Sequence, residues 1–308
     1  MVICNDLNHI QHFNKSVLTI GSLDGMHRGH IGIISDLKAI SKINKVPSVV
    51  ITFDPHPKTV LNPNKKSNQY LLSVDKKIEY LEKQYVDYVW LIPFNKKFSK
   101  LSAEEFINRY IFTFFNPCDI IIGYDHHFGC NRKGDKKFLL KNKIQYGYNL
   151  HIKEPILYHD APIKSSRIRS YLNLGHVDKA NECLGRKYEF SGTIVKGQGL
   201  GSKLKFPTAN VLPHNVNQLI PAHGVYFVDV IIENSLYSGM CNIGFRPTFY
   251  ENENECIEVH LFSNDQLHLY DKDIVIRFNK YLRKEKKYNS SSELVQQLVL
   301  DRQKCISI

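Results

Sequence analysis

The spacing of the apolar residues changes near residues 184–187, and this change constrains the fold more than any other feature of the sequence. Before it, short β-branched runs alternate with helical patterns in which apolar residues recur every three or four positions. The strand-like runs are 17–20, 49–53, 88–92 and 119–122, and the helical ones are 33–40, 74–85 and 104–114. Strands that alternate with helices predict an α/β fold with a doubly wound parallel sheet.

Beyond residue 187 the pattern consists of strands separated by turns rich in Gly, Pro and Asn. The strand-like runs are 190–195, 225–231, 236–243, 256–262 and 274–278. Such a series predicts an antiparallel β-barrel that is closed or nearly closed. Residues 292–303 follow a serine run able to cap a helix, so we expect a terminal helix closing the barrel.

This pattern predicts two domains, 1–185 and 186–308, with short amphipathic segments at 166–174 and 177–184 linking them. The 308 residues, 43% apolar and 23% charged, are enough to build two cores. No apolar run approaches the roughly 18 residues that a membrane span needs, and polar residues stand where a signal peptide would be apolar. We therefore expect a cytoplasmic protein. The seven cysteines form no CxxC pair, so neither a disulfide framework nor a cysteine-ligated zinc site is predicted.

The chain carries 41 Lys and Arg against 30 Asp and Glu, a formal net charge of +11. This excess favours anionic partners such as nucleotides or nucleic acids. The basic residues are dispersed and are not interleaved with aromatics as in a nucleic-acid groove. We therefore expect small anionic substrates, with no nucleic-acid or membrane partner. The oligomeric state is left open.

A glycine turn and two histidines follow the first strand-like run. The segment 21–30 reads GSLDGMHRGH, and His27 and His30 lie three residues apart at a helix start, so they share one face. A helix start offers backbone N–H groups and a partial positive charge, and two imidazoles there can donate hydrogen bonds to phosphoryl oxygens. Gly21 and Gly25 allow a tight turn, and Gly29 allows a nucleotide to approach the backbone. Surface decoration is the alternative interpretation of such a pair.

Two other segments of the first half carry groups suited to a nucleotide. Ser165 and Ser166 precede a helix with Arg167 in its first turn, and hydroxyls with a forked guanidinium can hold a polyphosphate. An ordinary capped helix is the alternative. The segment 122–129, IGYDHHFG, leaves a strand with an acid and aromatic rings at its carboxyl end. These rings can stack on a planar ligand or simply pack within the loop.

The barrel half contains a glycine loop and three polar residues of interest. Gly197, Gly199 and Gly201 mimic a dinucleotide-binding turn, but no helix follows them. Thr208 and Asn210 alternate onto one side of an extended segment, where their oxygens suit Mg²⁺ bound with phosphates.

Glu258 shares a strand face with His260 and Phe262, and its carboxylate can accept a proton from a substrate hydroxyl during phosphoryl transfer. A polar strand face is the alternative for each residue taken alone.

The first half resembles the adenylyltransferase module of the bacterial bifunctional riboflavin kinase/FAD synthetases, which are HxGH nucleotidyltransferases. The matching segments, in order, are GSLDGMHRGH, TFDPHP at 52–57, GYDHHFG at 123–129 and SSRIR at 165–169. The resemblance implies transfer of AMP from ATP to FMN, with release of pyrophosphate and with His27 and His30 stabilising the transition state. The residues it implies for nucleotide and phosphate binding are Gly21, Asp24, Gly25, Gly29, Ser165, Ser166 and Arg167. Asp125 and Phe128 would bind the flavin.

The second half resembles the riboflavin kinase module of the same family. The matching segments are the glycine loop, FPTAN at 206–210, GVY at 224–226, NIGFRPT at 242–248, EVHL at 258–261, LY at 269–270 and YLR at 281–283. By this likeness Thr208 and Asn210 hold the phosphates of MgATP beside Gly197, Gly199 and Gly201. Glu258 deprotonates the ribityl hydroxyl of riboflavin, and Arg283 lies near the flavin. Mg²⁺ with ATP is the implied cofactor, and riboflavin, FMN and FAD are the flavin substrates and products.

The chain departs from the family pattern at several positions. In the first half these are Ser22, Leu23, His126, Lys164 and Ser166, of which His126 replaces an aromatic residue. In the barrel loop Ser202 replaces an Arg and Lys205 replaces a Gly, which obstructs the nucleotide loop if that glycine is needed for its conformation. An FAD synthetase with a weak or inactive kinase module is therefore the alternative function. A flavin- or nucleic-acid-binding regulator without turnover is a third.

Overall fold

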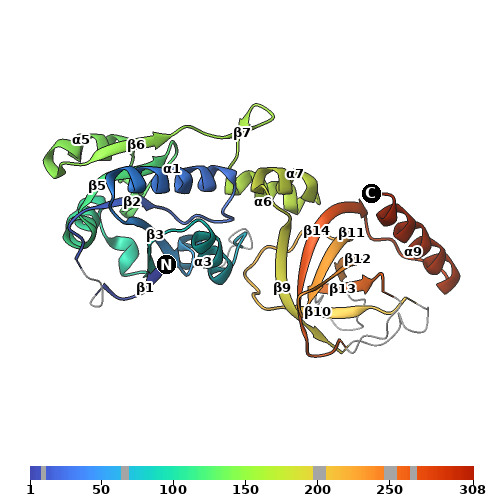
Figure 1. The fold of residues 1–308 in the computed structure, drawn as a ribbon. Helices are drawn as coiled ribbons and strands as arrows, with labels where there is room; N and C mark the ends of the chain where they lie inside the picture. The colour runs from blue at the N-terminus through green and yellow to red at the C-terminus, as the bar shows by residue number, and fades with distance from the viewer. Residues whose placement is uncertain (8–11, 64–68, 197–205, 246–254, 264–268) are drawn as a thin grey trace. The chain divides into compact units, whose positions relative to one another are not determined.

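The computed structural model describes residues 1–7, 12–63, 69–196, 206–245, 255–263 and 269–308. They form two compact units, Met1–Ser165 and Ser166–Ile308 (Figure 1). Among the described residues, no helix has the length and apolar character needed to cross a membrane.

The first unit is built on a six-stranded sheet in which all neighbouring strands are parallel. The strands are β1 (Val2–Cys4), β2 (Ser16–Ile20), β3 (Ser48–Asp54), β4 (Tyr88–Pro93), β5 (Pro117–Gly123) and β6 (Asn149–Lys153), in the order β1-β4-β3-β2-β5-β6. The predicted doubly wound sheet is confirmed. The chain moves outward from β2 through β3 and β4, then returns to place β5 on the other side of β2. This reversal of strand order is the point at which such sheets bind ligands, beyond the carboxyl ends of their strands.

Helices and short ribbons complete the first unit. They are α1 (Arg28–Asn44), α2 (Pro57–Leu61), α3 (Val74–Lys83), α4 (Ala103–Phe106), α5 (Lys136–Tyr146), the π-helix η4 (Ile107–Phe115), the 3₁₀ turns η3 (Phe98–Lys100) and η5 (Cys130–Arg132), and the ribbon β7 (Leu157–Tyr158) with β8 (Ala161–Pro162). Apolar clusters cover both faces of the sheet: Leu18 and Ile20 of β2 belong to one cluster, and Val17 belongs to the other.

The single helix predicted at 104–114 is a short α-helix that continues as a π-helix. Ser102 caps α4 in a capping box with Glu105. Further along, the N–H of Asn116 donates to the carbonyl of Ile111, five residues earlier. The wider helix keeps Ile107, Ile111 and Phe115 buried on one face.

The second unit is a closed antiparallel barrel with the strand order β10-β13-β12-β11-β14-β9. The strands are β9 (Tyr188–Val195), β10 (Ala209–Pro213), β11 (Gly224–Ile232), β12 (Ser235–Phe245), β13 (Glu255–Leu261) and β14 (Asp273–Arg283), with the helices α6 (Ser165–Asn173), α7 (Val177–Leu184) and α9 (Ser291–Ile306). The predicted barrel and terminal helix are confirmed, and Ser290 caps α9 as its serine run indicates. Tyr226 packs edge-on against Phe278 inside the barrel.

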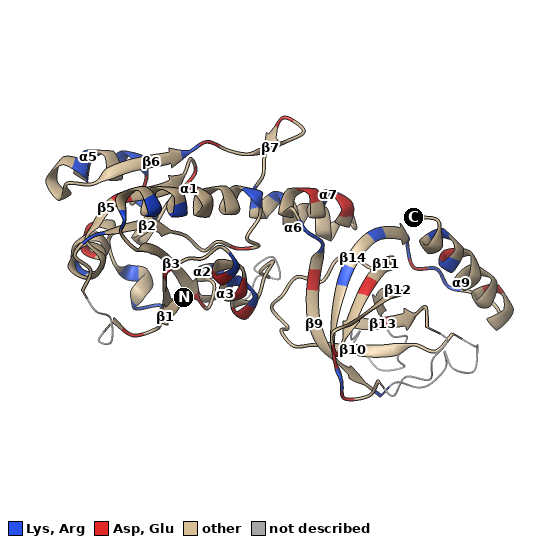
Figure 2. Cartoon of the chain, in the orientation of Figure 1, with Lys and Arg blue, Asp and Glu red and all other residues tan. Residues whose placement is uncertain are grey.

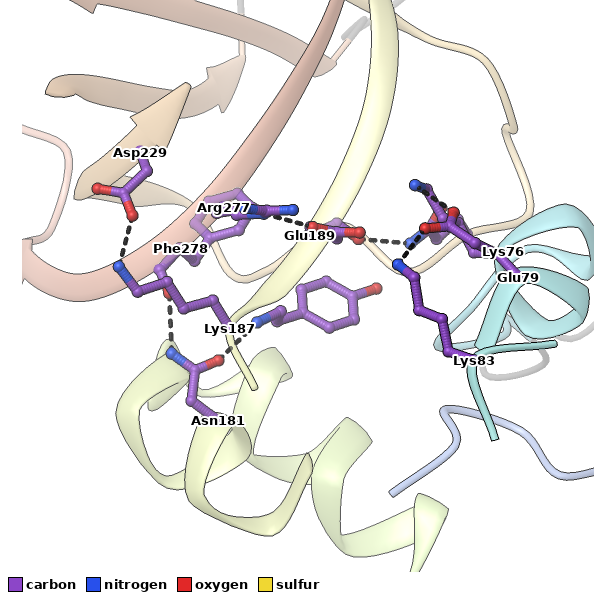
Figure 3. A network of polar contacts seen from close by, with 11 residues as sticks. Lys76, Glu79, Lys83, Asn181, Lys187, Glu189, Asp229, Arg277 and Phe278 are labelled. Atoms are coloured by element: carbon purple, nitrogen blue, oxygen red, sulfur yellow. Dashed lines mark hydrogen bonds and ion pairs between the residues drawn. The ribbon is translucent and has the colours of Figure 1, made fainter. Parts of the chain in front are cut away.

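Polar contacts fix α7 to the barrel (Figure 3). The side-chain amide of Asn181 donates to the carbonyl of Phe278 at 2.8 Å and accepts from the N–H of Tyr188 at 2.7 Å. On the adjoining strands, Arg277 pairs with Glu189 at 2.6 Å, and Lys187 pairs with Asp229. The compact units and the predicted domains 1–185 and 186–308 therefore differ in where they place α6 and α7, and the domain boundary stays a prediction.

Charged residues are distributed over both units. Figure 2 shows Lys and Arg on α1, α3, α5 and β14, with Asp and Glu among them on α3 and α7. The basic excess of the composition is thus spread over several elements in the described part of the chain.

Two candidate active sites

A cavity of about 760 Å³ lies at the point where the strand order of the parallel sheet reverses. Its wall comes from the segments that follow β2, β3 and β5 and from the start of α1. The lining includes Gly21, His27, His30, Phe53, Phe128 and Ser165. The structure thus brings together the histidine segment, the loop that contains GYDHHFG at 123–129 and the first serine of SSRIR within the first unit.

The two histidines form one stacked pair at the start of α1. Their ring centroids lie 3.6 Å apart with an interplanar angle of 17°. His27 is the N-cap of α1, and its Nδ1 accepts the backbone N–H of His30 at 3.4 Å. A Cβ at Gly29 would lie 3.1 Å from the His27 ring, so glycine leaves room for this arrangement. Imidazoles and the positive helix end therefore face the cavity together, where they can stabilise negative charge.

Backbone conformation and hydrogen bonds stabilise the turn before α1. Gly25 adopts φ +81°, the left-handed region that glycine occupies without strain. The buried carboxylate of Asp24 accepts the N–H of Leu71 at 2.8 Å, and the carbonyl of Asp24 accepts the Ser165 hydroxyl at 2.9 Å. Asp24 and Gly25 are not among the residues that line the cavity, whereas Gly21 and Gly29 are. The geometry gives Asp24 a supporting role, and its predicted phosphate contact stays a prediction.

Lys77, a buried lysine that was not among the predicted site residues, is linked through Thr52 to the turn that precedes α1. Lys77 of α3 is 4% exposed, and its Nζ donates to Oγ1 of Thr52 at 3.2 Å. Thr52 in turn donates to the carbonyl of Ser22 at 3.3 Å. Burial lowers the pKa of Lys77 to about 8, although the negative charges of Asp24 and Asp54 oppose that shift. The available signal was its position four residues before Leu81, the other buried residue of α3.

Lys77 should make the stability of the fold depend on pH in a defined direction. Its pKa is about 8 when folded and 10.5 when exposed, so between these values the unfolded chain binds more protons and stability rises with pH. We expect wild type to gain on the order of 2 kcal/mol relative to Lys77→Met between pH 8 and pH 10. Urea unfolding of both proteins measures this difference. Ionisation of the tyrosines affects the stability of both proteins alike and therefore cancels from the difference. A difference that does not change with pH would contradict a buried, charged Lys77.

The loop after β5 is held rigidly around Phe128. Phe128 and Gly134 exchange backbone hydrogen bonds of 2.9 and 3.0 Å. A Cβ at Gly134 would lie 2.7 Å from the Phe128 ring, so only glycine fits there. Asp125, also in the cavity wall, forms an ion pair of 3.3 Å with Lys164. The aromatic ring and the acid predicted to face the flavin therefore share one wall.

Ser166 and Arg167 lie on α6, in the second unit. Ser166 is exposed, and Nε of Arg167 donates to the hydroxyl of Tyr171 at 2.9 Å. The guanidinium also lies 5.4 Å from the ring centroid of Tyr171. Their binding of pyrophosphate stays a prediction.

A second polar cluster lies on the outer face of the barrel. In the strand register, Glu258 is the neighbour of Asn210 on one side and of Asn242 on the other, so the three side chains share a face. Sγ of Cys256 lies 3.4 Å from Oδ1 of Asn210 and 3.6 Å from Oε1 of Glu258. Asn242 donates to Glu285 at 3.3 Å. The cluster offers oxygen ligands of the kind Mg²⁺ prefers, and its members Cys256, Asn242 and Glu285 were not predicted.

The segment before β10 is attached to the same face. Nδ1 of His260 lies 2.9 Å from the carbonyl of Pro207, and burial lowers the pKa of this histidine, so the neutral ring donates to the carbonyl. This bond holds the chain next to Thr208, whose side chain is exposed. The glycine loop with Gly197, Gly199, Gly201, Ser202 and Lys205 lies outside the described residues.

Arg283 attaches the terminal helix to the barrel. Its guanidinium pairs with Asp301 of α9, with Nε and Nη2 at 2.8 and 2.7 Å from the same oxygen. Asp301 is fully buried and also accepts from Gln297 at 2.9 Å. Such a pair is costly to break from one side only. A contact between Arg283 and the flavin stays a prediction.

Comparison with known proteins agrees with this division into two sites. Residues 9–167 match the family model described as FAD synthetase, and residues 184–308 match the one described as riboflavin kinase. The solved structure titled as a macrolide-efflux protein from Streptococcus pneumoniae superposes with a TM-score of 0.87 at 29% identity, over 98% of this chain and 97% of that one.

Curated relatives extend the similarity over nearly the whole chain. The bifunctional riboflavin kinase/FMN adenylyltransferase of Bacillus subtilis is 35% identical over 95% of this chain and 92% of its own. The protein of that name in Buchnera aphidicola subsp. Schizaphis graminum is 35% identical over 98% and 96%, and that of Escherichia coli K12 is 32% identical over 92% and 90%. The resemblance seen in the motifs is thereby confirmed, and the chain belongs to the bifunctional riboflavin kinase/FMN adenylyltransferase family.

Proposed function

We propose that this chain carries both activities named in its family: phosphorylation of riboflavin to FMN, and adenylylation of FMN to FAD. The observation that carries the proposal is the presence of two separate sites, each built from one motif set on its own fold. The stacked histidines occupy the ligand-binding edge of the parallel sheet. The Asn210–Glu258 pair occupies the barrel.

In the first unit, a phosphate oxygen of FMN attacks the α-phosphorus of ATP, and the bond from that phosphorus to pyrophosphate breaks. Negative charge accumulates on the α-phosphoryl oxygens during this transfer. His27, His30 and the start of α1 donate hydrogen bonds to those oxygens, and Ser165 holds the departing pyrophosphate. The resemblance assigns the same role to Ser166 and Arg167. The flavin lies against the loop of Asp125 and Phe128.

In the barrel, the ribityl hydroxyl oxygen of riboflavin attacks the γ-phosphorus of ATP, and ADP leaves. Glu258 accepts the proton that this hydroxyl loses. Thr208 and Asn210 supply oxygens for Mg²⁺. A magnesium ion bound mainly through substrate phosphates needs only one or two such protein ligands, and this fits the donor set of the cluster. When bound, the ion neutralises phosphate charge.

Thr208→Ala or Asn210→Ala should weaken the binding of MgATP as well as kinase turnover. These oxygens act in the ground state and in the transition state alike, so KM for ATP rises as kcat falls. Steady-state riboflavin phosphorylation over a range of MgATP concentrations measures both constants. FAD formation from FMN by the same preparations is the control and should be unchanged. A lower kcat with an unaltered KM for ATP would contradict the assignment.

Incubating the purified protein with riboflavin, ATP and Mg²⁺, followed by chromatography of the flavins, tests the proposed function. We expect FMN and then FAD. FAD made from supplied FMN, without any FMN made from riboflavin, would reject the two-activity proposal in favour of an FAD synthetase with an inactive kinase module. The cytoplasmic location and the lack of nucleic-acid and membrane partners stay predictions.

A further inference from the structure

The TFDPHP segment begins with a residue that the proposed function does not use. Thr52 of β3 is fully buried, and the alternation along the strand places it on the same face as Val50. That face belongs to the apolar cluster that includes residues of α1 and α3. The hydroxyl of Thr52 lies between Lys77 of α3 and the carbonyl of Ser22, in the turn before α1. Hydrocarbon side chains here would avoid the cost of burying a charge, so the polar pair calls for an explanation.

The chemistry of the three groups fixes the direction of their hydrogen bonds. A lysine ammonium can only donate, so the oxygen of Thr52 accepts from Nζ of Lys77 at 3.2 Å. A backbone carbonyl can only accept, so the hydroxyl proton of Thr52 is directed to Ser22 at 3.3 Å. Lys77 therefore determines which way Thr52 donates, and each bond polarises the other.

The turn that receives this hydrogen bond has a strained backbone. Leu23 and Met26 adopt φ of +48° and +38°, the left-handed region that residues other than glycine rarely occupy. Such conformations cost free energy and persist only where surrounding contacts hold them. His27 follows Met26 directly and begins α1 as its N-cap. A shift of the turn would therefore move the histidine pair.

Lys77 supports the turn without reaching the substrate cavity. In the described part of the chain, the cavity wall includes Ser22 but neither Lys77 nor Thr52. The negative charges that favour the ammonium form of Lys77 are those of Asp24 in the turn and Asp54 at the end of β3. Lys77 therefore acts on the site through the residues between it and the cavity.

We propose that Lys77 is a positioning residue of the adenylyltransferase site. Acting through Thr52, it holds the carbonyl of Ser22 and with it the turn before α1. The histidine pair that follows the turn is thereby kept in line with the α-phosphoryl group of ATP, where a displacement of about 1 Å can cost on the order of a hundredfold in rate. The inference rests on the proposed function, which assigns that group to the histidines.

Variants at both positions separate the hydrogen bonds from packing. Thr52→Val keeps the shape of the side chain but removes the hydroxyl, so kcat for FAD formation from FMN should fall about tenfold. Thr52→Ser keeps the hydroxyl and should restore most of that rate. Lys77→Met keeps an unbranched side chain without the donor and should show the same loss as Thr52→Val. KM for FMN and KM for ATP should stay within about threefold, because the histidines act chiefly in the transition state.

The double variant distinguishes a relay from two independent packing effects. If Lys77 acts through Thr52, Thr52→Val with Lys77→Met should be no slower than either single variant, whereas independent effects would multiply to about a hundredfold. Lys76→Met is the matched control, since Lys76 is the neighbouring lysine of α3 and pairs with Glu79 at 2.8 Å. This change should leave FAD formation unchanged.

Riboflavin phosphorylation in the barrel is the internal control for each preparation and should not change. A kcat in Thr52→Val within twofold of wild type would overturn this inference alone, and so would losses that multiply in the double variant. If Lys77→Met does not fold, the two threonine variants decide: recovery of the rate in Thr52→Ser supports the inference, and an equal loss in both overturns it. Wild-type protein that forms no FAD from FMN would instead overturn the proposed function, and the inference with it.

Discussion

Replacing His27 with Ala is expected to lower the rate of FAD formation from FMN by about a hundredfold or more. Removing one donor to a developing phosphoryl charge typically costs about 3 kcal/mol in the transition state. The change also removes the ring that stacks on His30 and the acceptor that caps α1. Single-turnover and steady-state assays of FMN adenylylation measure the loss.

His27→Asn is the matched control for the cap. Asn is as good an N-cap as any residue, so this variant should keep the stability of α1 while it lacks the imidazole nitrogen proposed to donate to the phosphate. Thermal unfolding near that of wild type, combined with slow FAD formation, is the expected result. FAD formation at a near-normal rate in His27→Ala would show that the site has been misplaced.

Replacing Glu258 with Gln is expected to lower kcat for riboflavin phosphorylation by roughly 10² to 10⁴. Gln keeps the shape of the side chain and can keep its contact with Cys256, but it cannot accept the hydroxyl proton. The affinity for MgATP should be nearly unchanged, because a general base acts only on the proton in motion. Turnover at saturating MgATP, with KM for ATP measured in parallel, tests both statements.

Glu233→Gln provides a control on an exposed glutamate of the same unit, which forms a surface ion pair of 2.9 Å with Lys272. It should leave turnover unchanged.

If the glycine loop limits the kinase, wild type is already slow, and Lys205→Gly with Ser202→Arg should raise riboflavin phosphorylation. An active wild type that is indifferent to Glu258→Gln would contradict the assignment of Glu258 as the base.

The sequence predicted the strands whose apolar runs are long and β-branched, and it missed β1, β6, β10 and the two-residue strands β7 and β8. β1 has only three residues, and its Val2 and Ile3 are 52% and 46% exposed, so it carries no burial pattern. β6 is the other edge strand of the sheet, and its residues NLHIK are mixed in polarity. β10 was predicted only as an extended segment, since Pro207 precedes it and Pro213 is its last residue.

Site residues that lie close together in the sequence were easier to predict than those that lie far apart. The histidine pair was predictable because a strand, a glycine turn and a helix start position both rings within ten residues. Lys77 and Asn242 were missed because their contacts with Thr52 and Glu258 join segments far apart in sequence. Cys256 lies two residues before Glu258 on the same strand, so the alternation along β13 could have indicated it. The departure at His126 was visible in the sequence, but only the folded loop shows that its buried Nε2 has no hydrogen-bond partner among the described residues.

The flavin products of three proteins, compared side by side, test the central claim that one chain holds two independent sites. Wild type, His27→Ala and Glu258→Gln are each given ATP and Mg²⁺ with either riboflavin or FMN, and the products are separated by chromatography. We predict that wild type makes FAD from both flavins, that His27→Ala converts riboflavin to FMN and stops, and that Glu258→Gln makes FAD only from supplied FMN. Loss of both reactions in either well-folded variant, or no loss in either, would contradict two separate sites.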